Sequence, residues 1–163
     1  MSTTGNTTVP PSGHHLLVEL RNDGIYFASF DPLEDDTYQS CSVSFTAKNR
    51  PLCENVKNCV YENPQLLQEY DRTYILVDTS HFTFVPEELE KEEENRLPYY
   101  DFCFSGHDDH VIEHHLVLNH AYLLFGVEHE LYTFLCRTFS NPIILHPLAS
   151  LCEYFFLHSR NGN

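Results

Sequence analysis

Thiol, imidazole and carboxylate side chains gather in one short stretch of the sequence, residues 103–115. Thiolate and neutral imidazole suit zinc or nickel, and Cys103, His107 and His110 would converge on one ion if the chain turned sharply at Ser105-Gly106. Their spacing matches no established zinc signature, and dense ligands without such spacing are a weak indication of a metal site. The sequence therefore favours a polar loop with exposed histidines, and zinc binding at these three residues is the alternative.

A second group of reactive side chains is contiguous. Asp78-Thr79-Ser80-His81 places an acid, two hydroxyls and a histidine together. Catalytic triads assemble from distant segments, and the chain contains no G-x-S-x-G elbow. A polar turn between two strands is the favoured interpretation, so we expect no hydrolytic centre here.

The composition limits the class of protein. The 163 residues are 42% hydrophobic and 13% aromatic, enough for one domain with a sizeable core. Nine Lys and Arg oppose 24 Asp and Glu, a formal net charge of −15. Nucleic-acid binding uses a basic stripe that this chain lacks, and anionic membranes are disfavoured for the same reason. The run of glutamates at residues 87–94 indicates a solvated face rather than a site for a basic partner.

The termini and cysteines indicate a cytoplasmic protein. Residues 1–13 are polar, have no signal-peptide pattern, and are predicted to be a flexible tail before one domain over residues 14–163. No apolar run is long enough to span a membrane. The six cysteines include no C-x-x-C pair, and we expect most of them to be buried free thiols.

The first half of the chain predicts a meander followed by a helix. Apolar and polar residues alternate at 40–46, which predicts a half-buried strand. Asp23-Gly24 predicts a tight hairpin turn with positive φ, and Pro51 suits the first position of a helix. The predicted elements are strands at 14–20, 25–30, 40–46 and 74–77, the last buried on both faces, and a helix from 51 that Asn63-Pro64 breaks.

The second half predicts further alternation of strands and helices. The helix at 148–158 has an apolar stripe of Leu151, Cys152, Phe155 and Phe156. On a strand at 111–115, His114 and His115 would point to opposite faces. The remaining predicted elements are an edge strand at 81–85, an acidic helix from 86 to 94, strands at 99–104, 121–125 and 143–145, and a helix at 128–139.

Together these elements predict an α/β fold, a mixed sheet that opens with an antiparallel three-strand meander and is flanked by helices. The segments at 17–27, 82–89 and 119–127, followed by a helix and by residues 144–147, resemble the N-terminal half of an uncharacterised Bacteroidetes family, DUF3822. The resemblance implies a divergent member of the actin-like ATPase superfamily with a ribonuclease H-like lobe. It also implies one lobe of a two-lobe protein, with an exposed apolar face where the other lobe docks.

The resemblance also places a nucleotide site. In actin-like ATPases the first hairpin carries an Asp for the metal, and glycines and a hydroxyl residue for the phosphates. The matching positions here are Glu19, Asn22, Asp23 and Gly24, with one glycine and no adjacent Ser or Thr. The chain has neither G-x-x-x-x-G-K-[ST] nor G-x-G-x-x-G. The turn is therefore degraded relative to the family pattern.

These observations predict a non-catalytic interaction or scaffold domain on a degenerate actin-like lobe. Its expected partner is another protein or its own second lobe, with a homodimer as a further possibility. The alternative is a protein that binds a nucleotide or a metal, as Mg-ATP at Glu19–Gly24 or zinc in the stretch 103–115. No cofactor is expected under the first interpretation, and site geometry rather than fold must decide between the two.

Overall fold

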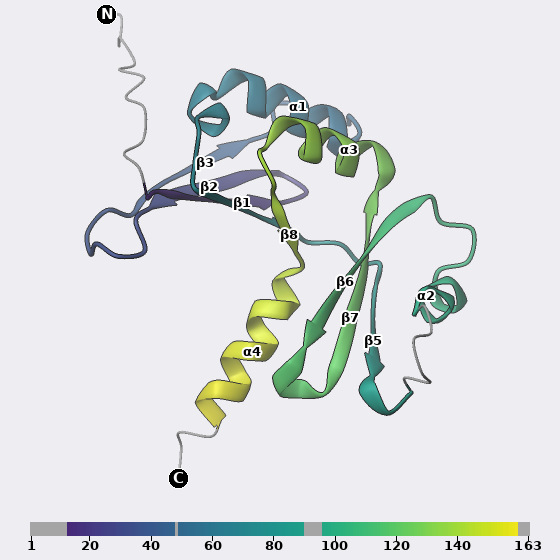
Figure 1. Cartoon of the computed structure of the whole chain (residues 1–163). Helices are drawn as coiled ribbons and strands as arrows, with labels where there is room; N and C mark the ends of the chain where they lie inside the picture. The colour runs from purple at the N-terminus through teal and green to yellow at the C-terminus, as the bar shows by residue number, and fades with distance from the viewer. Residues whose placement is uncertain (1–12, 48, 90–95, 160–163) are drawn as a thin grey trace, which may run out of the picture. The chain divides into compact units, whose positions relative to one another are not determined.

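A computed structural model describes residues 13–47, 49–89 and 96–159 of the chain (Figure 1). The chain divides into two compact units. The first unit comprises the chain up to Leu76 together with residues 133–144, and the second comprises residues 77–132 and the chain from Leu145 onward. The predicted tail at residues 1–13 lies outside the described residues except for Gly13. The prediction of one domain over residues 14–163 stays a prediction.

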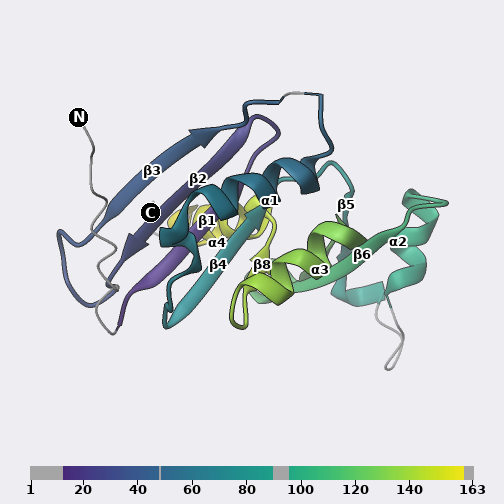
Figure 2. The same cartoon turned by 90° about the horizontal axis from the view of Figure 1, so that it is seen from above.

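The first unit is built on a five-stranded mixed sheet. Its strand order is β3-β2-β1-β4-β8, and the first three strands form an antiparallel meander, as predicted (Figure 2). Side chains alternate along β1, so that Leu16, Val18 and Leu20 are buried on one face. The strands are β1 (His15–Leu20), β2 (Gly24–Phe30), β3 (Gln39–Ser44), β4 (Arg72–Val77) and β8 (Ile143–Leu145).

Two helices, α1 and α3, lie on the same side of this sheet (Figure 1). Helix α1 (Leu52–Glu62) turns Val56 and Val60 inward, and its buried Asn55 donates hydrogen bonds from Nδ2 to the carbonyl oxygens of Ala47 and Arg50. A short 3-10 helix, η1 (Pro64–Leu67), follows the break at Asn63. The rings of Tyr61 in α1 and Phe134 in α3 (His129–Thr138) pack edge to face, 6.0 Å apart. The predicted helices at 51–62 and 128–139 are therefore confirmed.

Two predictions of strand burial were wrong. Strand β3 was expected to be half buried, but it is the outer strand of the sheet and only Val43 in it is partly covered. Strand β4 was expected to be buried on both faces, yet burial alternates along it, with Thr73, Ile75 and Val77 on the covered side. A short apolar run does not by itself distinguish one covered face from two.

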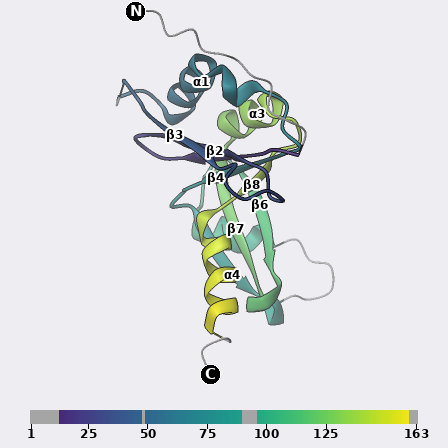
Figure 3. The same cartoon turned by 90° about the vertical axis from the view of Figure 1, so that its left-hand side faces the viewer.

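The second unit contains an antiparallel three-stranded sheet in the order β5-β7-β6. Its apolar core includes Val85, Tyr100, Tyr122 and Leu124. Helix α4 lies beside β6, and this arrangement is visible in Figures 1 and 3. The strands are β5 (Phe82–Pro86), β6 (Asp109–Leu116) and β7 (Ala121–Glu128). The helical segments are η2 (Glu87–Leu89), α2 (Leu97–Cys103), η3 (Val117–Asn119) and α4 (Pro147–Ser159).

The predicted strand at residues 99–104 is wrong, because this segment belongs to helix α2. The aromatic run that begins at Tyr99 has high β-propensity, but Pro98 falls at one of the first two helical positions, where its fixed φ favours the helix. Helix α2 places Tyr100 completely inside the unit and leaves Phe102 exposed.

The predicted acidic helix at residues 86–94 is observed in part. Only the short 3-10 helix η2 is present within the described residues, and residues 90–94 of the prediction lie outside them. In the described part of the chain, no helix is long and apolar enough to cross a membrane.

The cysteines are free thiols, but fewer are buried than expected. Cys53 and Cys59 are buried in α1, whereas Cys41, Cys103 and Cys136 are exposed. Cys41 is exposed because β3 is an edge strand. Burial also raises the pKa of the Cys59 thiol, and the carboxylate of Glu62 adds to the increase.

Candidate functional site

The turn between β1 and β2 is the position of the expected phosphate site. The backbone N–H of Arg21 donates to the carbonyl oxygen of Gly24 at 3.0 Å, which closes the turn. The guanidinium of Arg21 makes a bidentate ion pair with the carboxylate of Glu19, at 2.9 and 2.8 Å. Glu19, Asn22, Asp23 and Gly24 therefore lie together on one hairpin, and the acidic group on the strand is already paired with a cation of the same chain.

The reason for Gly24 differs from the one predicted. Positive φ was expected there, but Gly24 does not have it. Instead, a Cβ at position 24 would clash with the backbone of Val43 and would lie 3.0 Å from the Cα of Ser44. The N–H of Phe45 donates to the carbonyl oxygen of Asp23 at 2.8 Å, which holds β3 close to the turn. The glycine is needed for strand pairing.

The histidine-rich stretch does not bring its three predicted ligands together. His107 contacts Asp101 and Asp109, while the Sγ of Cys103 lies 3.8 Å from the Oγ1 of Thr83. The ring of His110 stacks on Tyr132, with centroids 3.5 Å apart. Among the described residues, no three His, Cys, Asp or Glu side chains form a group that could hold a metal ion.

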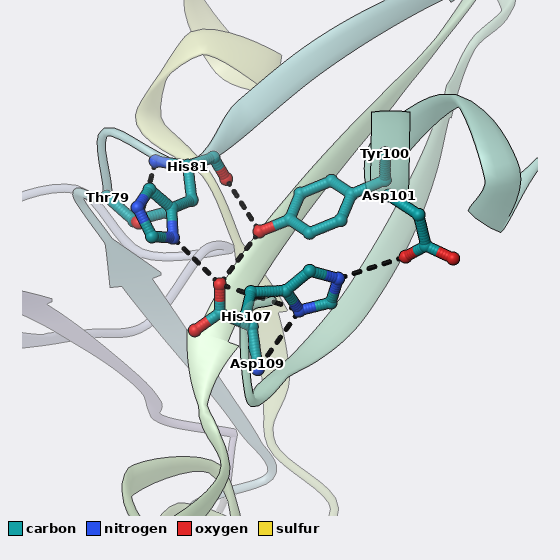
Figure 4. Close-up of polar contacts among 6 residues, drawn as sticks. All are labelled: Thr79, His81, Tyr100, Asp101, His107 and Asp109. Atoms are coloured by element: carbon teal, nitrogen blue, oxygen red, sulfur yellow. Dashed lines mark hydrogen bonds and ion pairs between the residues drawn. The ribbon is translucent and has the colours of Figure 1, made fainter. Parts of the chain in front are cut away.

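A network of hydrogen bonds does form around the carboxylate of Asp109, at the start of β6 (Figure 4). Its Oδ2 accepts a hydrogen bond from the hydroxyl of Tyr100 at 3.0 Å and lies 2.8 Å from Nδ1 of His81. Because an ionised carboxylate only accepts, Nδ1 of His81 carries the proton. The network joins helix α2, the turn before β5 and the start of β6.

The same network fixes the tautomer of His107. The backbone N–H of Asp109 donates to Nδ1 of His107 at 3.2 Å, so this nitrogen is unprotonated. The proton then lies on Nε2, which donates to Oδ1 of Asp101 at 3.0 Å. The ring of His107 meets that of Tyr100 edge-on, at 4.8 Å.

Burial raises the pKa of Tyr100, and the hydrogen bond and negative charge of Asp109 raise it further. The phenol therefore stays protonated and serves as a hydrogen-bond donor. The Tyr100 hydroxyl lies against Gly126 of β7. A Cβ at Gly126 would clash with this hydroxyl and would lie 2.6 Å from Oδ2 of Asp109. Gly126 also donates from its backbone N–H to the carbonyl oxygen of His81 at 2.9 Å.

The pair of His81 and Asp109 has the geometry of a histidine oriented by a carboxylate, with Nε2 left for another group. The side chain of His81 is 48% exposed and that of Asp109 is 15% exposed. The Oγ1 of Thr79 accepts a hydrogen bond from the backbone N–H of His81. Within the described residues, no hydroxyl or thiol forms a hydrogen bond with Nε2 of His81. The arrangement therefore orients the imidazole of His81 against the carboxylate of Asp109.

The sequence did not indicate Tyr100, Asp109 or Gly126 as partners. One signal was present, since an isolated glycine inside an apolar strand marks a close approach of another group. Gly126 is such a glycine within β7.

The other histidines lie on the two faces of β6, as predicted for His114 and His115. Nε2 of His114 lies 3.8 Å from the carboxylate of Glu153 in α4. Nε2 of His115 contacts the carboxylate of Glu87, which Nδ1 of His120 also contacts at 3.0 Å. These two contacts lower the pKa of Glu87. They tie η2 to β6 and to the turn before β7.

Helix α4 carries a large uncovered apolar surface. The predicted stripe is split, because Cys152 and Phe156 are partly covered while Leu151 and Phe155 face outward. We call the exposed side the α4 face. It consists of Leu151, Tyr154, Phe155 and Leu157, whose exposed fractions are 47%, 54%, 64% and 52%.

The α4 helix is anchored at its first turn. The backbone N–H of Leu148 donates to Nδ1 of the buried His146 at 3.1 Å, and Nε2 of His146 donates to the carbonyl oxygen of Thr79 at 2.9 Å. His146 thus has both ring nitrogens paired, and the start of the helix is fixed to the turn before β5. The helix that carries the α4 face is therefore held in place at its N-terminal end.

The five-stranded sheet, its opening meander and its covering helices define a ribonuclease H-like lobe of the actin-like ATPase fold. A crystal structure from Bacteroides thetaiotaomicron VPI-5482, of a protein with actin-like ATPase fold and unknown function, is similar to this chain with a TM-score of 0.81 and 29% sequence identity. The match covers 93% of this chain and 59% of that one, so the chain spans about three fifths of the length of that protein. A comparison with curated proteins finds no match.

The family follows from a second comparison. The model of DUF3822, described as a protein of unknown function, matches residues 5–163. The chain belongs to this family, and the resemblance inferred from its segments is confirmed.

Proposed function

We propose that this chain is a non-catalytic interaction lobe, which binds a second protein lobe through the α4 face. The α4 face is the observation that carries the proposal. A helix that is apolar around most of its circumference is ordinarily covered by protein on every side, and contiguous exposed apolar surface marks an interaction site.

The comparison with the Bacteroides thetaiotaomicron protein supports a lobe as the occupant. That chain includes a further portion that this chain does not match. A second lobe would supply the apolar surface that the α4 face lacks.

The state of the β1–β2 turn supports a non-catalytic role. A phosphate site requires free backbone amides and an acidic group available to a metal. Here the carboxylate of Glu19 is held by Arg21, and Gly24 lies against the backbone of β3. Both features give structural roles to residues that match the phosphate turn of actin-like ATPases.

The interaction is tested by placing a photo-crosslinking amino acid at position 155 of the full-length gene product in its native cell. We expect crosslinks from position 155 to protein outside residues 13–159, mapped by mass spectrometry. With the crosslinker moved to position 154, the otherwise unchanged chain should crosslink as well, and the double variant Leu151→Glu/Phe155→Glu should not. Ser150→Glu/His158→Glu adds two negative charges at exposed positions of the same helix and should retain the crosslinks. An uncrosslinked α4 face would overturn the proposal.

The alternative function, binding of Mg-ATP or zinc, is separated by thermal unfolding. A ligand that binds the folded state stabilises it by RT ln(1 + [L]/Kd), so the melting temperature rises with the ligand concentration. The interaction proposal expects equal melting temperatures with and without Mg-ATP, and with and without zinc. An increase that grows with the Mg-ATP concentration and that Glu19→Gln removes would instead support nucleotide binding at the β1–β2 turn. An increase that Cys103→Ser removes would support zinc binding in the stretch 103–115.

A further inference from the structure

Strand β3 is the outermost strand of the five-stranded sheet, and Figure 2 shows it at the sheet's border. Its six residues, Gln39–Ser44, include no charge and no proline, and all except Val43 are exposed. In the part of the chain that the structure describes, no strand pairs with its outer side.

The hydrogen-bond register shows which backbone groups β3 presents at this border. Phe45 donates to Asp23 across the β2–β3 ladder. In an antiparallel ladder, bonded and non-bonded pairs alternate, so residues 43, 41 and 39 also bond toward β2. The pairs between them, which include Ser44 with Gly24 and Ser42 with Tyr26, are the pairs without hydrogen bonds to β2. The N–H and C=O groups of Ser40, Ser42 and Ser44 therefore point away from the sheet.

Soluble proteins usually protect such a border with charged side chains, proline or a bulge, because an open strand edge is a template for pairing. Strand β3 contains neither a charged residue nor a proline. Its three outward residues are all serines, spaced symmetrically about Ser42, and so they suit pairing with an identical strand.

We propose that β3 pairs with β3 of a second copy of this chain, antiparallel and about a two-fold axis at Ser42, so that one sheet continues across the dimer. This register places Ser42 opposite Ser42 and Ser40 opposite Ser44. It uses all the outward backbone groups of both strands, whereas any shift leaves some of them without a strand partner.

The charges at the two ends of β3 favour the antiparallel arrangement. Glu34, Asp35 and Asp36 precede the strand, and Arg50 follows it. Antiparallel pairing brings the acidic end of one strand to the end of the other strand that leads to Arg50.

The net charge of −15 opposes association of two copies, but the strand at the contact is itself uncharged. Self-association should consequently strengthen as the salt concentration rises.

The first test is sedimentation velocity of the whole chain over a concentration series. Ser42→Pro removes one outward N–H without removing a bond to β2, and edge strands tolerate proline at such positions. We expect the wild type and Ser42→Ala to dimerise, and Ser42→Pro to raise the dissociation constant about tenfold or more, because two hydrogen bonds at the axis are lost. A wild type that stays monomeric, or a dimer that Ser42→Pro leaves unchanged, would overturn the proposal.

The second test does not depend on the folding of the proline variant. In a background of Cys41→Ser, the register places two Ser42→Cys residues as a hydrogen-bonded pair, with a Cα separation of about 5.5 Å that a disulfide spans. Mild oxidation should link Ser42→Cys chains through position 42, identified by mass spectrometry. Ser40→Cys in the same background faces position 44 and should not link to itself. Equal linking of the two variants would contradict the register.

The two tests also distinguish the occupant and the interface. An extended peptide from another protein would leave the isolated wild type monomeric, which counts against a second copy. A dimer built on the α4 face would be abolished by Leu151→Glu/Phe155→Glu and not by Ser42→Pro. The proposed function through α4 and the pairing of β3 can thus fail independently.

Discussion

The hydroxyl of Tyr100 donates a 3.0 Å hydrogen bond to Oδ2 of Asp109, and both groups occupy space that a side chain on Gly126 would fill. The pair connects a helix to the first residue of a strand across the surface of the neighbouring strand. Since Tyr100 is completely buried, the hydrogen bond satisfies a hydroxyl that water cannot reach. The stability of the second unit should depend on all three residues together.

Gly126→Ala should lower the free energy of unfolding by about 1–3 kcal/mol, the usual cost of overpacking. The added Cβ would displace the Tyr100 hydroxyl and the Asp109 carboxylate. Urea denaturation followed by circular dichroism measures the change.

Its control is the double variant Tyr100→Phe/Gly126→Ala. Removal of the hydroxyl relieves part of the clash, so the double variant should be more stable than the sum of the two single effects implies. Strict additivity would mean that the hydroxyl and residue 126 do not compete for space.

At alkaline pH, Tyr100 should make the protein less stable. Its pKa in the folded state is raised above the ordinary value of 10.0, so the unfolded chain ionises first. Stability is then fully present below about pH 10 and is lost as the pH rises through the folded-state pKa. Urea denaturation between pH 8 and pH 11 should show this decrease. Tyr100→Phe should flatten the decrease, while Tyr99→Phe on the exposed side of the same helix should not.

At acid pH, Glu87 should contribute a loss of stability. Contacts with His115 and His120 lower its folded-state pKa below the ordinary value of 4.5. The contribution is therefore present above the unfolded pKa and disappears as the pH falls through the folded pKa. Glu87→Gln should give a weaker dependence of the unfolding free energy on pH between 6 and 3. Glu88→Gln removes the same charge from the same short helix, and it should retain the dependence of the wild type.

Alkylation should separate the cysteines into two groups. Thiolates react, so the buried Cys59, whose pKa is raised, should resist iodoacetamide in the folded protein, as should the buried Cys53. Cys41, Cys103 and Cys136 are exposed and should be modified first. Peptide mass spectrometry before and after unfolding in urea measures the order. Rapid modification of Cys59 in the folded state would contradict the packing of α1.

Much of the fold could be predicted because periodic apolar patterns recur where one face is buried. The alternation of Leu16, Val18 and Leu20 gave β1, and Val56 with Val60 gave the inner side of α1. Helix α2 was missed because its aromatic residues have strand propensity and only Pro98 marked its beginning. Local preference was overridden by the packing of Tyr100.

The candidate sites were harder to predict than the elements. Two partners of Asp109, His81 and Tyr100, come from other elements, and no local spacing encodes a contact between such separate segments. Cys103, which was predicted as a metal ligand, is the last residue of helix α2, and its Sγ lies against Thr83. The sequence pattern did not predict this helix. The resemblance to one lobe of two implied an exposed apolar face without saying where it lies, and the docking of another lobe on the exposed residues of α4 stays a proposal.

Gly24 alters how a sequence motif in this family can be used. Its Cβ position is excluded by the backbone of β3, so selection for a correctly paired sheet is sufficient to retain the glycine. A chain that binds no phosphate would still carry this glycine. A glycine in the first hairpin of a related sequence is accordingly no indication, by itself, that the chain binds a nucleotide.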